Sequence, residues 1–60
     1  MIADGVLNML KAENQYYDYV KANPAATQKE KSQALLKASS DNGLGYKAFS
    51  HLEKRLVLGV

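Results

Sequence analysis

The sequence predicts an all-α fold, a small three-helix bundle with helices at about residues 2–22, 28–40 and 46–58 that is completed by dimerisation. Three observations predict it: apolar residues at heptad spacing in the first third, a helix-capping motif before the second helix, and an amphipathic pattern near the end. The chain has 60 residues, so we expect one domain, 1–60. A core this small seldom contributes more than about 3–5 kcal/mol, so we expect a second copy or a partner protein to support it.

The first helix is predicted by an apolar seam whose members lie three, four or seven residues apart, which keeps them on one helix face. The seam comprises Ile2, Val6, Met9, Tyr16 and Val20, with Glu13 at the skipped position between Met9 and Tyr16. Leu10 and Tyr17 lie beside the seam and broaden it. The helix ends before Pro24, because the residue preceding a proline is disfavoured in a helix. We expect the seam, including Glu13, to bind a second copy or a partner helix.

Two polar positions of this helix need an interpretation of their own. Glu13 either lies at the edge of a small core, where it reaches water or pairs with a lysine, or makes a buried polar contact that fixes the register of a dimer. Tyr19 lies on the face opposite Val6 and Tyr17, so we expect it to be exposed. Exposed tyrosine is common on surfaces and is also enriched in binding sites.

The second helix is predicted to begin at Gln28. Thr27 and Glu30 form a capping-box pattern, in which each side chain bonds the backbone N–H of the other residue. The helix stops at Asn42-Gly43, where one of the two residues takes the left-handed conformation that often ends helices.

The third helix is amphipathic, with an apolar stripe formed by Phe49, Leu52 and Leu56. Its opposite face carries basic residues at helical spacing: Lys47, His51, Lys54 and Arg55. This face is either a solvated surface or a surface that contacts phosphate groups. The chain then ends on the apolar run 57–60, which we expect to pack on another helix or on a partner.

Catalytic chemistry is not predicted. The sequence contains one histidine, His51, and no cysteine, so neither a nucleophile with its base nor a zinc-binding cluster can be assembled from the usual residues. The six carboxylates are scattered, and Gly43-Leu44-Gly45 lacks the other residues of a phosphate-binding loop. We therefore expect no enzyme activity, no cofactor, no metal site and no small-molecule substrate. Without cysteines or a long apolar segment, we expect a cytoplasmic protein that does not bind membranes.

Residues 35–54 resemble the helix-turn-helix of small phage-type repressors. The residues that carry the resemblance are Ala38, Ser39, Gly43, Leu44, Phe49 and Leu52. The resemblance implies that the third helix faces the major groove of DNA. The implied contacts to bases or phosphates come from Gly45, Tyr46, Lys47, Ser50, His51 and Lys54, with Arg55 on the same basic face.

Two functions follow from these patterns. The first is a non-enzymatic interaction module that self-associates or binds a partner protein through the seam of its first helix. The alternative is a DNA-binding transcriptional regulator of helix-turn-helix type, acting as a dimer with two basic helices on two half-sites.

Overall fold

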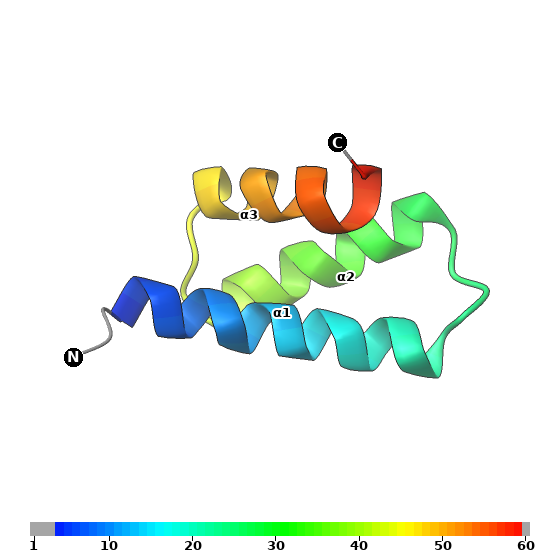
Figure 1. Ribbon diagram of the computed structural model, residues 1–60, viewed down its shortest axis with the longest axis horizontal. Helices are drawn as coiled ribbons and strands as arrows, with labels where there is room; N and C mark the ends of the chain where they lie inside the picture. The colour runs from blue at the N-terminus through cyan, green and yellow to red at the C-terminus, as the bar shows by residue number, and fades with distance from the viewer. Residues whose placement is uncertain (1–3, 60) are drawn as a thin grey trace.

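The computed structural model describes residues 4–59, which form three α-helices and a short π-helical segment, with no strand in that range. The helices are α1 (Asp4–Ala22), α2 (Gln28–Asp41) and α3 (Tyr46–Glu53), and α3 continues into the π-helix η1 (Lys54–Leu58). The chain runs along α1, returns along α2 and turns again into α3 (Figure 1). The all-α class and the three helices are therefore confirmed. No helix within residues 4–59 has the length and apolar character needed to span a membrane.

The start of α2 confirms the predicted capping box. The Glu30 backbone N–H donates to Thr27 Oγ1 at 3.2 Å, and the Thr27 backbone N–H donates to Glu30 Oε1 at 3.0 Å. Before it, the Asn23 backbone N–H closes the end of α1 by donating to the Tyr19 carbonyl at 2.9 Å. Local sequence signals thus fix where α1 ends and α2 begins.

The turn between α2 and α3 is held by hydrogen bonds to α1 and α2. Gly43 adopts a φ of 72°, the left-handed conformation predicted for this position. Asn42 Nδ2 donates to the Ala38 carbonyl at 2.8 Å and to Gln15 Oε1 at 3.1 Å. The other end of the Gln15 amide donates to Asp41 Oδ2 at 3.0 Å. One side chain of α1 therefore ties α1 to the end of α2.

The C-terminal segment leaves the α-helical register after Glu53. An α-helix turns by about 100° per residue, which would direct Leu56 toward the core and Val57 away from it. The wider π turn rotates less per residue, and both side chains pack against the core. Gly59, with a φ of 72°, closes the segment by donating its N–H to the Lys54 carbonyl. The expectation that the apolar end of the chain packs on another helix holds for Val57, whereas Leu58 is exposed and Val60 lies outside the described residues.

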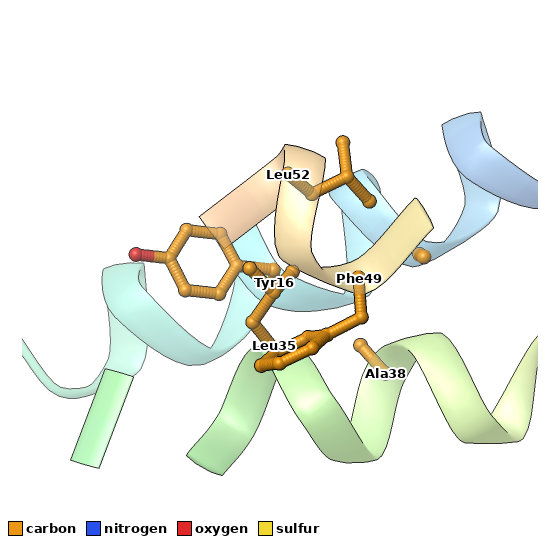
Figure 2. Close-up of a cluster of buried hydrophobic side chains, with 6 residues drawn as sticks. Tyr16, Leu35, Ala38, Phe49 and Leu52 are labelled. Atoms are coloured by element: carbon orange, nitrogen blue, oxygen red, sulfur yellow. The ribbon is translucent and has the colours of Figure 1, made fainter. Parts of the chain in front are cut away.

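The core is small and lies where the three helices meet. Its buried hydrophobic residues are Ala12, Tyr16, Leu35, Ala38, Phe49 and Leu52, five of which are labelled in Figure 2. On α1 this buried face is rotated from the predicted seam toward Ala12, because α2 packs on that side of the helix. The rotation leaves Leu10 and Tyr17 exposed.

α2 and α3 are joined by a short turn at residues 42–45. The two helices run in opposite directions, and α2 stays in contact with the chain through α3 and into η1 (Figure 1). The pair is an antiparallel helical hairpin, and α1 lies against it as the third helix.

Candidate interaction surfaces

Three hydrophobic side chains form an exposed stripe along α1. Val6, Leu10 and Tyr17 are 51, 48 and 50% exposed, respectively. They are four and seven residues apart, so they lie on one face of the helix and span about three turns. We call this set the α1 stripe. Leucine and tyrosine at this spacing are typical of helix faces that pack against another helix.

The predicted seam is divided between the core and the surface. Tyr16 is buried, while Met9 and Val20 pack partly buried against the core. Val6 is the seam residue that stays exposed, and Ile2 lies outside the described residues. Among the predicted seam residues, Val6 therefore supplies most of the apolar area that a partner could contact. Leu10 and Tyr17, beside the seam, extend this area.

Glu13 is largely buried at the edge of the core and forms an ion pair with η1. Its Oε1 lies 3.6 Å from Arg55 Nη2, and the Arg55 side chain is half exposed. The pair agrees with the interpretation of Glu13 as a core-edge residue, with an arginine in place of the expected lysine. It also joins two surfaces, because Glu13 lies between Leu10 and Tyr17 on α1 and Arg55 lies one turn after His51.

Basic side chains form a row on the outer face of α3 and η1. Lys47, His51 and Lys54 are exposed, and Arg55 is half exposed. We call these four residues the basic row. Two other predicted contact residues lie apart from it: Ser50 is half-buried, and the exposed Tyr46 ring lies against Phe49 with their centroids 5.7 Å apart.

A shallow groove of about 460 Å³ lies between α1 and α2. Its walls are formed by Gln15, Tyr19, Glu30, Gln33, Ala34 and Lys37. The prediction that Tyr19 is exposed is wrong, because α2 packs on that side of α1 and leaves the ring half-buried. Within residues 4–59, no three His, Cys, Asp or Glu side chains gather into a group that could hold a metal ion.

Two titratable groups are shifted by their surroundings. Burial raises the pKa of the Tyr16 phenol, and the neighbouring Tyr17 raises it further. The Tyr16 hydroxyl donates to the Leu56 carbonyl at 3.4 Å, a long bond that links α1 to η1. The Thr27 backbone N–H, which donates to the Glu30 carboxylate, lowers the pKa of Glu30, and the Thr27 side chain lowers it further. Both shifts have structural causes and neither group lies on the α1 stripe or the basic row.

Sequence reasoning missed three features of these surfaces. Ala12 was not assigned to the core, although its spacing of four residues from Tyr16 places the two on one helix face. The partner of Glu13 was not identified, because Arg55 is distant in sequence and only the packing of η1 brings the two together. The buried Ser39 hydroxyl, which has no hydrogen-bond partner within the described residues, carries no sequence signal at all.

Comparison with known proteins gives no family assignment. No protein-family model, curated protein or solved structure matches the chain. The surface features that bear on function are the α1 stripe, the basic row and the ion pair between them.

Proposed function

We propose that this protein is a non-enzymatic helical interaction module that binds another helix through the α1 stripe. The balance of large hydrophobic side chains carries the proposal. Within the described residues, seven are exposed and five pack partly buried against the core, whereas only four, Tyr16, Leu35, Phe49 and Leu52, are buried. Single exposed hydrophobic residues are normal on protein surfaces, but three in line on one helix are typical of a contact site.

The size of the α1 stripe indicates the kind of complex that we expect. Its three exposed side chains cover about three helical turns, which is a small contact area. Interfaces that bury less than about 1,200 Å² in total are typical of weak and transient complexes. We therefore expect a reversible complex rather than a permanent one.

Site-specific photo-crosslinking in the cells that make the protein tests this proposal. A photoreactive phenylalanine analogue is placed at Leu10 or, as a control, at Leu36, which is equally exposed at 49% but lies on α2. We expect a crosslinked product from position 10 that disappears when Tyr17→Glu is added, and none from position 36. A product of twice the chain mass identifies self-association. Equal products from both positions, or none from position 10, would contradict the proposal.

Binding to a nucleic-acid backbone is a second candidate function, supported by the exposure of Lys47, His51 and Lys54 in one row. The test is fluorescence anisotropy of a random-sequence duplex at about 50 and 200 mM salt. Contacts to several phosphates release counterions, so affinity should fall by orders of magnitude over this range. Lys47→Glu combined with Lys54→Glu should abolish binding in a folded protein, and unchanged binding would exclude this function.

A further inference from the structure

We infer that the partner of the α1 stripe is an amphipathic helix with acidic residues along one flank, which lies over the α1 stripe and the basic row together. This inference rests on the proposed function and adds the chemistry of the partner. It follows from the position of the two surfaces relative to each other.

The ion pair between Glu13 and Arg55 places the two surfaces side by side. Glu13 is three residues after Leu10 and four before Tyr17, so all three lie along the same side of α1. Arg55 is four residues after His51 and eight after Lys47, so these basic side chains lie along the same side of α3 and η1. Because Oε1 and Nη2 are 3.6 Å apart, the edges of the two rows meet at this pair. An apolar row and a basic row thus form one continuous surface.

A helix lying on this surface would contact both rows. Packed helices are about 8–10 Å apart, and Glu13 of α1 already contacts Arg55 of η1, so a helix seated over α1 would have side chains near the Arg55 end of the basic row. Its apolar side chains would cover Leu10 and Tyr17, and carboxylates on one flank would face Lys47 and His51. The arrangement corresponds to the helix-in-groove mode of recognition. The chain's net charge of +2 also favours encounter with an acidic partner.

Charge favours an acidic helix over the other possible occupants of this surface. A second copy paired antiparallel through the α1 stripe, with the two-fold axis across the helices, would bring the two basic rows toward each other, and like charges oppose such contact. A nucleic-acid backbone would engage the basic row and leave the α1 stripe uncovered.

Two synthetic peptides test the inference directly. Both are amphipathic helices of about 20 residues with the same leucine face, and they differ only in having glutamate or lysine along one flank. Binding to the full chain is followed by fluorescence anisotropy of the labelled peptide. We expect the glutamate peptide to bind with a micromolar dissociation constant and the lysine peptide at least about tenfold more weakly. Raising the salt concentration should reduce this difference, since it screens the charges.

Two variants locate the binding surface, each with a matched control. Leu10→Glu should weaken binding of the glutamate peptide at least about tenfold, and Leu36→Glu should leave it unchanged. Lys47→Glu should weaken it several-fold, and Lys29→Glu, an exposed lysine on α2, should not. Circular dichroism of each variant establishes that it is folded.

The possible failures separate the inference from the proposed function. If both peptides bind equally and Leu10→Glu weakens both, the α1 stripe binds helices and the acidic specificity is wrong. If neither peptide binds, the inference is wrong, and the photo-crosslinking experiment decides the proposed function. Stripe-dependent dimerisation at about 100 μM in sedimentation equilibrium, or stripe-dependent flotation with phosphatidylglycerol vesicles, would also overturn the inference in favour of a second copy or a membrane.

Discussion

Two neighbouring leucines of α2 provide the sharpest test of the fold. Leu35 is 0% exposed and lies in the core, whereas Leu36 is 49% exposed on the same helix. The two substitutions Leu35→Ala and Leu36→Ala remove the same atoms from adjacent positions. Any difference in their effects therefore measures burial, because the change in side-chain chemistry and in helix propensity is identical.

The expected magnitudes differ widely. Truncating a fully buried leucine to alanine costs about 2–5 kcal/mol, because apolar contacts are lost and a cavity remains. The whole chain is expected to be stable by only about 3–5 kcal/mol. Leu35→Ala should therefore leave the protein close to its unfolding midpoint at 25 °C or beyond it. Leu36→Ala should change stability by no more than about 0.5 kcal/mol, as is usual for surface positions.

Urea denaturation followed by circular dichroism at 222 nm gives both values at a protein concentration of a few micromolar. If Leu35→Ala unfolds too readily to give a folded baseline, Leu35→Met is measured in its place. This substitution conserves volume and should lower the free energy of unfolding by less than about 1.5 kcal/mol. Equal losses from Leu35→Ala and Leu36→Ala would show that the face of α2 assigned to the core is wrong.

Four further predictions concern single polar groups. Ser39→Ala should stabilise the protein by about 1 kcal/mol and so raise the midpoint of thermal unfolding, because it removes a buried hydroxyl that has no hydrogen-bond partner in the described residues. A lower midpoint would indicate that the hydroxyl does have a hydrogen-bond partner. Thr27→Ala should cost about 1 kcal/mol in urea denaturation through loss of the helix cap. The pKa of Glu30 is lower in the folded state than in the unfolded chain. The Glu30 carboxylate therefore stabilises the fold above the ordinary glutamate pKa of about 4.3, and this stabilisation is lost as the pH falls through the folded pKa. Glu30→Gln should reduce this acid sensitivity. In an absorbance titration at 295 nm, one of the four tyrosines should ionise at higher pH than the others, and Tyr16→Phe should remove that late component; its persistence would show that another tyrosine is responsible.

The helix boundaries could be predicted because they depend on short-range chemistry. The capping box of Thr27 and Glu30 and the left-handed Gly43 act within a few residues, so their effects are readable from the sequence. The rotation of the buried face of α1 could not be predicted in this way. It depends on where α2 packs, and the apolar residues of α1 extend around the helix far enough to allow more than one orientation.

The candidate surface was predicted only in its separate parts. The basic row follows from helical spacing in α3, and the apolar character of α1 is clear from the sequence. That the two lie next to each other depends on the contact of Glu13 with Arg55, which are separated by most of the chain. The π turn of η1 is also a tertiary effect, because it brings both Leu56 and Val57 to a core that exists only when the helices are packed.

The order in which the helices contact one another has a consequence for folding kinetics. Most contacts join α1 to α2 and α2 to the segment that follows it, so they connect parts of the chain that are neighbours in sequence. Such low contact order is associated with folding in microseconds to milliseconds. We expect this chain to open and reclose quickly, so that a bound helix would act mainly by lengthening the lifetime of the folded state.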